Sequence, residues 1–180
     1  MVGIRAGTTG EEDRVADVRE TVTLDGGILV GHDGSECAQD AVRWAGRLAA
    51  RADLDLHVLR AWSMTSAPRP STWEPGYVPP LRDWQQAVHD ELTEHVRALG
   101  LDPSVRVTCH TVHRAPARGL IEAAAGADLV VVGARGRGGF VGLLLGSVSD
   151  QVVHHAPCPV TVIRSGTARE LRGTGDPAKA

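Results

Sequence analysis

The chain has 180 residues, 42% of them hydrophobic, and a formal net charge of −3 at pH 7. This length and hydrophobic share suit one globular domain with tails. The mixed charges give no basic surface for a nucleic acid, and no apolar run approaches the roughly 18 residues of a membrane span, so we expect neither as a partner.

Residues 1–26 are predicted to form a flexible lead, because this stretch is polar and charged with little apolar content. It lacks the apolar region of a secretion signal. The cysteines, Cys37, Cys109 and Cys158, are widely spaced and form no CxxC motif. We interpret them as small, reduced core residues, which favours a cytoplasmic location.

Between residues 27 and 165, short apolar segments alternate with longer segments whose apolar residues recur at helical spacing. Ser35 is expected to cap the first helix, and Pro116 to open a later one. A long loop rich in proline and serine occupies 63–80. The predicted strands are Ile28–Val30, Leu54–Ala61, Val105–Val112, Asp128–Gly133 and Pro159–Arg164. A helix over Leu81–Leu99 is predicted before the third strand, and a short helix over Ser147–His155 after the fourth.

This order predicts a single doubly wound α/β domain over 27–165, with a five-stranded parallel sheet and about four helices on its two faces. Residues 166–180 are expected to form a disordered tail. In parallel sheets, ligands bind beyond the carboxyl ends of the strands. The turn Gly31–Ser35 and the loop Gly133–Ser147 both follow strands, so we expect them to face one ligand at the same edge of the sheet.

Glycines recur in the loop after the fourth predicted strand, at Gly133, Gly136 and Gly146, with Ser147 directly after the last. Glycine lets the backbone approach an anion closely. The start of a helix beyond Ser147 offers unpaired N–H groups and the positive end of the helix dipole. The pattern therefore predicts a loop that binds phosphates.

Two common phosphate loops do not fit this segment. A Walker A loop needs a lysine beside its final serine or threonine, and the only lysine in the chain is Lys179. The dinucleotide pattern G-x-G-x-x-G fails because Val141 stands where the third glycine belongs, and because this loop comes late in the chain.

These residues resemble the universal stress protein family, whose nucleotide signature is G-x2-G-x9-G-(S/T). That signature is present here as Gly133, Gly136, Gly146 and Ser147. Four further family motifs are matched in the expected order, by Val30–Ser35, Leu56–Val58, Ala127–Gly133 and Ala156–Val160. The resemblance covers about residues 27–165.

The resemblance implies a Rossmann-like domain that binds ATP, with Mg²⁺ accompanying the nucleotide. It would place Asp33 beside the adenosine, with Gly31 and His32 on the same turn and Val58 against adenine. Val132 and Gly133 would lie under the ribose and phosphates. The phosphates would be held by Gly136, Gly146, Ser147, Val148 and Ser149. Arg135 and Arg137 would add charge-assisted hydrogen bonds, unless they are solvated loop residues.

The function implied is that of a regulatory protein of the stress response, a nucleotide-dependent dimeric switch. In the family the last strand pairs with its copy in a second subunit, which here is Val160–Arg164, and the protein partner that reads the switch is not specified by the sequence. No catalytic residue is assigned. A slow ATPase or phosphoryl transferase, using Arg135, Arg137 and Asp33, and a binder of cyclic AMP are the alternatives.

Two tempting features are given simpler interpretations. His154 and His155 suggest a metal site, but adjacent helix residues point about 100° apart, so we expect no metal held by protein side chains. Trp62 and Trp73 flank or occupy the long loop, where they form either a lid over the base or part of the core.

Overall fold

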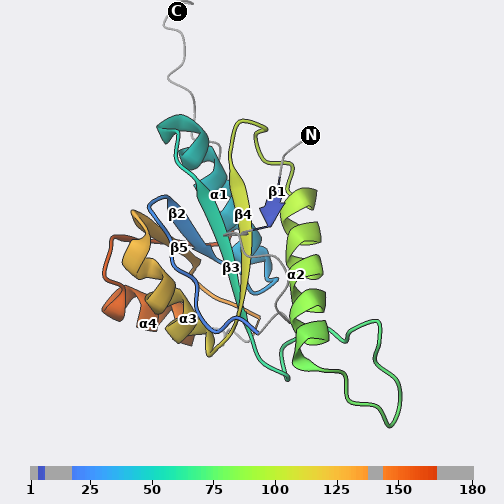
Figure 1. The fold of residues 1–180 in the computed structure, drawn as a ribbon. Helices are drawn as coiled ribbons and strands as arrows, with labels where there is room; N and C mark the ends of the chain where they lie inside the picture. The colour runs from blue at the N-terminus through green and yellow to red at the C-terminus, as the bar shows by residue number, and fades with distance from the viewer. Residues whose placement is uncertain (1–3, 7–17, 138–143, 166–180) are drawn as a thin grey trace, which may run out of the picture.

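The computed structural model describes residues 4–6, 18–137 and 144–165. Within these residues, a parallel sheet with the strand order β1-β4-β3-β2-β5-β6 lies between two layers of helices (Figure 1). The strands are β1 (Ile4–Ala6), β2 (Ile28–Gly31), β3 (Leu56–Trp62), β4 (Val107–His113), β5 (Leu129–Gly133) and β6 (Val160–Ile163). The helices are α1 (Glu36–Ala52), α2 (Leu81–Ala98), α3 (Pro116–Ala123), a 3₁₀ turn (Ala124–Gly126) and α4 (Ser147–His155).

The predicted doubly wound fold is confirmed, with all five expected strands present. The chain runs from β2 outward through β3 to β4, then returns to place β5 on the other side of β2. β2 is therefore paired in parallel with both β3 and β5. The direction of winding reverses between β2 and β5, and in open α/β sheets this reversal opens a crevice at the carboxyl ends of the strands.

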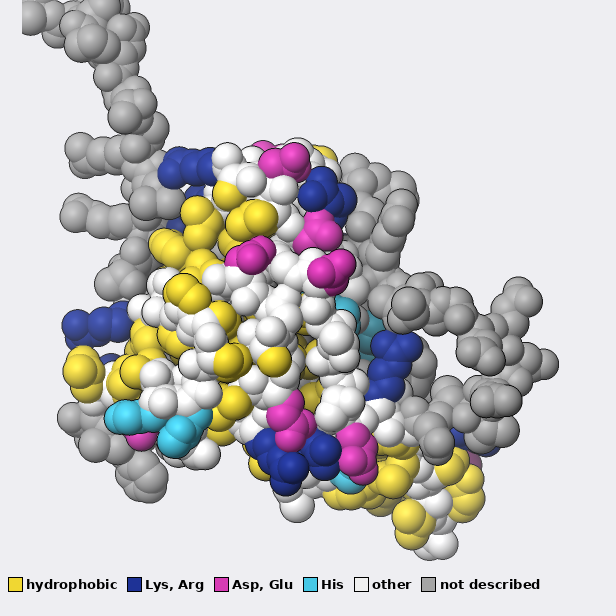
Figure 2. Space-filling model, turned by 60° about the vertical axis from the view of Figure 1, so that its left-hand side comes forward, with side chains coloured by type: hydrophobic (Ala, Val, Ile, Leu, Met, Phe, Trp, Pro, Cys, Tyr) yellow, Lys and Arg dark blue, Asp and Glu magenta, His cyan; other side chains and the backbone are white. Residues whose placement is uncertain are grey.

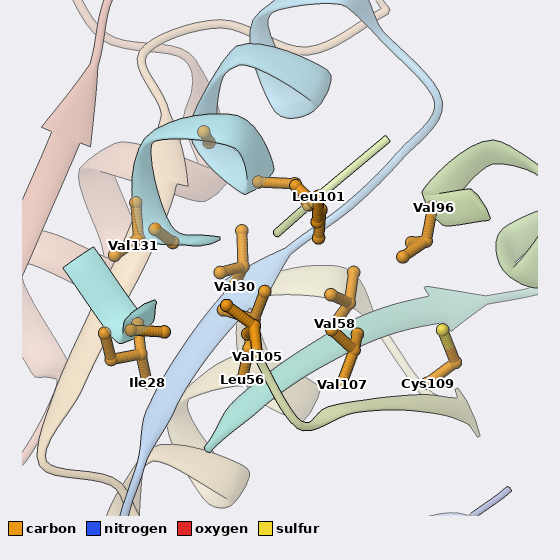
Figure 3. Packing of buried hydrophobic residues seen from close by; sticks show 14 of the residues in the cluster. Ile28, Val30, Leu56, Val58, Val96, Leu101, Val105, Val107, Cys109 and Val131 are labelled. Atoms are coloured by element: carbon orange, nitrogen blue, oxygen red, sulfur yellow. The ribbon is translucent and has the colours of Figure 1, made fainter. Parts of the chain in front are cut away.

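The face of the sheet under α1 and α2 holds the larger part of the core. Ile28, Val30, Leu56, Val58 and Val131 are each fully buried there, and Figure 3 shows their side chains gathered from neighbouring strands. The buried stripe of α1 is built mostly from alanine and valine. Small side chains let this helix lie close to the sheet, so a core poor in aromatic residues still packs densely.

The opposite face is covered by α3, α4 and a segment from the N-terminal lead. Leu29, Leu59 and Val130 are buried here against Leu120 of α3 and Val152 of α4. Along β3, side chains alternate between the two faces, as the pleat of a strand requires. This alternation places Leu59 and Ala61 on the side of β3 that faces the crevice.

The N-terminal lead is more ordered at its described residues than the sequence predicts. Ile4–Ala6 pairs with β4 as a sixth strand. Leu24 is buried on the face of the sheet that α3 and α4 cover. The N–H of Gly26 donates to the carbonyl oxygen of Gly126 at 2.7 Å. The segment 18–26 fills sheet surface that α3 and α4 leave uncovered, which explains its order. The boundary at residue 27 stays a prediction.

The long loop contains no helix or strand between β3 and α2. Trp62 is fully buried, with an exposed fraction of 0%, and it packs with Trp84 and Val88 of α2. Trp73 is 38% exposed and lies under the guanidinium of Arg69, 4.5 Å from the ring centroid. Trp62 is therefore a core residue rather than part of a lid.

Ser35 caps α1 as predicted, since its hydroxyl accepts a hydrogen bond from the N–H of Ala38 at 3.2 Å. Ser35→Ala removes this bond and is expected to lower the free energy of unfolding by about 1 kcal/mol, measured by urea denaturation. The control is Ser71→Ala in the exposed long loop, for which we expect less than about 0.5 kcal/mol. Equal losses in the two variants would contradict the capping role.

Candidate functional site

A cavity of about 750 Å³ opens where β2, β3 and β5 end. This volume lies in the range of small-molecule sites, about 300–1,000 Å³. Every residue of the predicted site except Val58 lines it: Gly31, His32, Asp33, Val132, Gly133, Arg135, Gly136, Gly146, Ser147, Val148 and Ser149. The two loops that the sequence singled out therefore meet at one cavity, on the edge of the sheet expected for a ligand.

Asp33 joins the two loops. Its Oδ1 accepts the N–H of Ser35 at 3.0 Å, and its Oδ2 accepts the N–H of Arg137 at 2.9 Å. Burial alone raises the pKa of the Asp33 carboxyl, but the hydrogen bonds from Ser35 and Arg137 bring that pKa below its usual value. The carboxylate is thus ionised at neutral pH. Since an ionised carboxylate has about four acceptor positions, it retains capacity for donors of a ligand.

The three signature glycines differ in the space around them. A Cβ on Gly133 would lie 3.0 Å from the backbone of Cys37, and one on Gly136 would strike Oδ2 of Asp33. Among the described residues, a Cβ on Gly146 would meet only ordinary contacts, the nearest being the carbonyl oxygen of Ala134 at 3.6 Å. The protein alone therefore explains the first two glycines. The contacts of the described residues do not explain the third.

Ser149 braces the loop rather than presenting a free hydroxyl. Its exposed fraction is 3%, and its Oγ is 2.9 Å from the carbonyl oxygens of Ala134 and Gly146. The N–H of Gly146 donates to the carbonyl oxygen of Ala134, and its nitrogen lies 3.0 Å from Oγ of Ser149. These bonds fix the start of α4. The groups best placed for an anion are the N–H groups of Ser147 and Val148, because the first N–H groups of a helix have no partner within it.

The apolar wall of the cavity comes from Leu59 and Ala61 of β3 and from Leu120 and Val132. Val58, predicted to contact adenine, is not among the lining residues. Its exposed fraction is 0%, and it lies in the core under α1 and α2 (Figure 3). Because strand residues alternate between faces, Leu59 and Ala61 point to the face opposite Val58 and reach the cavity, whereas Val58 points into the core.

Positive charge lines the cavity beside the glycines. Arg135 and Arg137 are both exposed and line it, so each guanidinium is available to a negatively charged ligand. Arg60 also lines the cavity, but it is 3% exposed and its Nη1 contacts Oε2 of Glu91 on α2 at 2.6 Å. This partly buried ion pair joins β3 to α2, so we assign Arg60 a structural role.

His32 lies at the end of β2 with its ring turned into the protein. The residue is 4% exposed, and its ring centroid is 5.6 Å from that of His95 on α2. Neither ring nitrogen has a hydrogen-bond partner among the described residues. Burial, together with the nearby His95 and Arg60, lowers the pKa of His32 to about 4, against a smaller opposing effect of Asp33. The ring is therefore neutral at physiological pH.

Residues that the sequence analysis missed line the rest of the cavity. They include Ala38 of α1, Pro116 of α3, Ser66 of the long loop and Asp150 of α4. Leu59 and Ala61 follow from the alternation along the predicted second strand. Ser66 had no such signal, because a loop without regular structure has no periodicity that predicts its path.

Among the described residues, no group of three or more His, Cys, Asp or Glu side chains is arranged to hold a metal ion. The rings of His154 and His155 lie 6.2 Å apart and are exposed. Asp150 and Ser147 line the cavity at the start of α4, and this suits a Mg²⁺ that arrives with phosphates, because Mg²⁺ commonly takes only one or two protein carboxylates. In the described part of the chain, no helix is both long and apolar enough to cross a membrane.

Comparison with known proteins relates this chain to a family. A model of the universal stress protein family matches residues 27–164. A universal stress protein of Mycobacterium tuberculosis, Rv2623, is 39% identical over 143 residues, which covers 76% of this chain and 44% of that protein. This chain thus spans less than half the length of that relative.

Solved structures show the same fold. A universal stress protein in complex with cAMP superposes with a TM-score of 0.53 at 27% identity, covering 79% of this chain and 98% of that one. UspA from Lactobacillus plantarum superposes with a TM-score of 0.60 at 24% identity, covering 80% and 100%. The second likeness bears on the fold alone.

The buried, neutral state of His32 predicts a loss of stability in acid. The unfolded chain takes up this proton near pH 6.5 and the folded protein only near pH 4, so stability is full above pH 6.5 and falls between 6.5 and 4. At pH 4.5, His32→Phe should recover about 2 kcal/mol of that fall, measured by denaturation at several pH values. His155→Gln, on the exposed end of α4, is the control. Parallel pH profiles for His32→Phe and the unmodified protein would show the assignment to be wrong.

Proposed function

This chain belongs to the universal stress protein family, and we propose that it binds ATP in the cavity between the β2–α1 and β5–α4 loops and acts as a nucleotide-dependent switch. The observation that carries the proposal is the space at Gly146. The other two signature glycines are required by close contacts within the protein, whereas Gly146 adjoins open cavity at the start of a helix. That combination suits the close approach of a phosphate.

Each part of the nucleotide has a matching part of the cavity in this proposal. Leu59, Ala61 and Leu120 give the base an apolar wall. The remaining acceptor positions of Asp33 suit the ribose hydroxyls. The first N–H groups of α4 and the guanidinium of Arg135 suit the phosphates, whose charge Mg²⁺ would partly neutralise when bound.

A regulatory role is favoured over catalysis by the groups around the proposed phosphate position. Phosphoryl transfer relies on a positioned nucleophile and on groups that neutralise the developing charge. Asp33, the carboxylate at the centre of the site, is already held by two backbone N–H groups, which lowers its basicity. It is therefore better suited to positioning than to proton abstraction.

The proposed switch includes a homodimer formed through β6. Among the described strands, β6 ends the sheet on the side next to β5. Figure 2 views the molecule with this side turned forward, and hydrophobic side chains spread over the left and middle of the face. An unpaired strand edge beside apolar surface favours pairing with a second copy. β6 also follows α4 directly, so a change at the phosphate end of the cavity is close to the proposed interface.

Cyclic AMP is a second candidate ligand, because the universal stress protein solved with cAMP is 27% identical to this chain. The two ligands share the adenosine part and differ at the phosphates. Cyclic AMP has a single phosphate, so it makes less use of the exposed arginines beside the glycine loop. We favour ATP because Arg135 and Arg137 both line the cavity.

Gly146→Ala tests the phosphate end of the site. The added methyl group fits the protein alone but occupies the space proposed for the phosphates, so we expect ATP affinity to fall by about 10-fold or more while the fold persists. Adenosine affinity should stay unchanged. Both affinities are measured by isothermal titration calorimetry.

Asp33→Ala is the matched control, because it acts on the nucleoside end and should weaken ATP and adenosine alike. If a folded Gly146→Ala protein bound ATP as tightly as the unmodified protein, Gly146 would not belong to the site. Loss of ATP binding alone in Asp33→Ala would place that carboxylate at the phosphates instead.

Val160→Glu tests the dimer. A charge on an edge strand opposes pairing with another strand, so the variant should be monomeric at concentrations where the unmodified protein is dimeric, measured by light scattering after size-exclusion chromatography. His155→Glu, an exposed change on α4, should leave the dimer intact. A monomeric unmodified protein, or a Val160→Glu variant that still dimerises, would contradict the proposed interface.

A further inference from the structure

A second cavity lies at the opposite end of the molecule from the proposed nucleotide site. Its volume is about 460 Å³, and it is lined by Arg43, Arg47 and Arg51 of α1 and by the segment 99–104 that leads from α2 to β4. The last turns of α1 and the loop before β4 both lie at the top of Figure 1, near the amino ends of the strands. We call this cavity the arginine groove.

The three arginines are spaced to act together. They follow one another at intervals of four residues, so they lie on one side of α1 over about 12 Å of helix. Gly46 and Ala50 line the groove between them. A Cβ on Gly46 would lie only 3.0 Å from Cδ2 of Leu101, so glycine at this position lets Leu101 pack against the helix beneath the arginine side chains.

The guanidinium of Arg47 gives the strongest argument for a ligand in the groove. Its Nε and Nη2 atoms are buried and have no hydrogen-bond partner among the described residues. Buried guanidinium nitrogens without a partner are costly, because the group loses its hydration without a replacement. Because these atoms are buried, an anion in the groove reaches them only when the Arg47 side chain turns outward, and it then supplies the acceptors that the described residues do not. Arg43 contacts Oδ1 of Asp40 through Nη1 at 3.2 Å, and a guanidinium has five donors.

The charge of the groove also favours an anion. Three arginines and one aspartate, Asp102, line it, which gives a formal charge of +2. The Asp102 carboxylate faces its own loop, where Oδ1 accepts both the N–H and the hydroxyl of Ser104, at 2.9 Å and 2.8 Å. Those bonds reduce its competition with an incoming anion.

We propose that the arginine groove binds a small anion that bears two or more phosphate groups. The volume is that of a small-molecule site, and guanidinium groups bind phosphate oxygens through paired, parallel hydrogen bonds. A row of several guanidinium groups matches an anion with several phosphates better than an anion with one phosphate. This inference is independent of the proposed nucleotide function, because the two cavities share no lining residue.

The test is a titration of ¹⁵N-labelled protein with inorganic tripolyphosphate, followed by the amide NMR signals. The amides of Gly46, Ala50 and Ser104 report on the groove, and those of Gly146 and Ser147 report on the other cavity. We expect saturable shifts at the groove amides. Arg47→Gln should weaken this binding by about 10-fold. The control, Arg82→Gln, removes an exposed arginine at the start of α2, and should change the affinity by less than about twofold.

Three outcomes would overturn the proposal. They are the absence of shifts at the groove amides, equal weakening in Arg47→Gln and Arg82→Gln, and tighter binding of a hexaglutamate peptide than of tripolyphosphate, which would indicate an acidic protein segment instead. If Arg47→Gln does not fold, Arg43→Gln takes its place with the same expectation. Shifts confined to Gly146 and Ser147 would bear on the nucleotide site and would also count against the groove.

Discussion

The Asp33 carboxylate is the constraint on which the site depends, because it bonds at once to the loop after β2 and to the loop after β5. These loops are 104 residues apart at the bonded positions. The reversal of winding beside β2 brings their strands together, and Asp33 then holds the two loops in register. Gly136 must be glycine for this arrangement, since a Cβ there would strike the carboxylate. One side chain therefore accounts for the shape of the cavity and for part of the glycine pattern.

Local patterns were enough to predict this part of the molecule. Ser35 and Pro116 mark helix starts in the sequence, and the structure begins α1 and α3 at those points. The spaced glycines and Asp33 were assigned from short motifs whose backbone geometry is fixed within a few residues. The sequence therefore predicted five of the six described strands, most helix boundaries and the glycine-lined end of the cavity.

Features set by distant packing were not predictable in the same way. A three-residue motif places Val58 on a strand but does not say which face it points to, and the pleat turns it into the core while Leu59 and Ala61 reach the cavity. Trp62 follows the strand into the space beside Trp84 of α2. The segment 18–26 is polar on average, yet Val22 and Leu24 complete an apolar layer. In each case the deciding contact is made by a residue far along the chain.

α1 connects the two ends of the molecule. It begins at Ser35, beside the carboxylate that organises the first cavity, and its second half lines the arginine groove at the other edge of the sheet. Its buried side is made of small residues, so the helix is held closely against the sheet between these two places. The fold thus presents two separate cavities, one near each end of α1.

The central claim is that the cavity at the switch point binds an adenine nucleotide through its phosphates. Calorimetric titration of nucleotide-free protein with Mg-ATP, with cyclic AMP in a parallel experiment, tests it most directly. The account predicts saturable, stoichiometric binding of ATP that is tighter than binding of cyclic AMP. Tighter binding of cyclic AMP would contradict the assignment of the arginines to a polyphosphate. No heat with either ligand, together with an unchanged melting temperature, would contradict the nucleotide site itself.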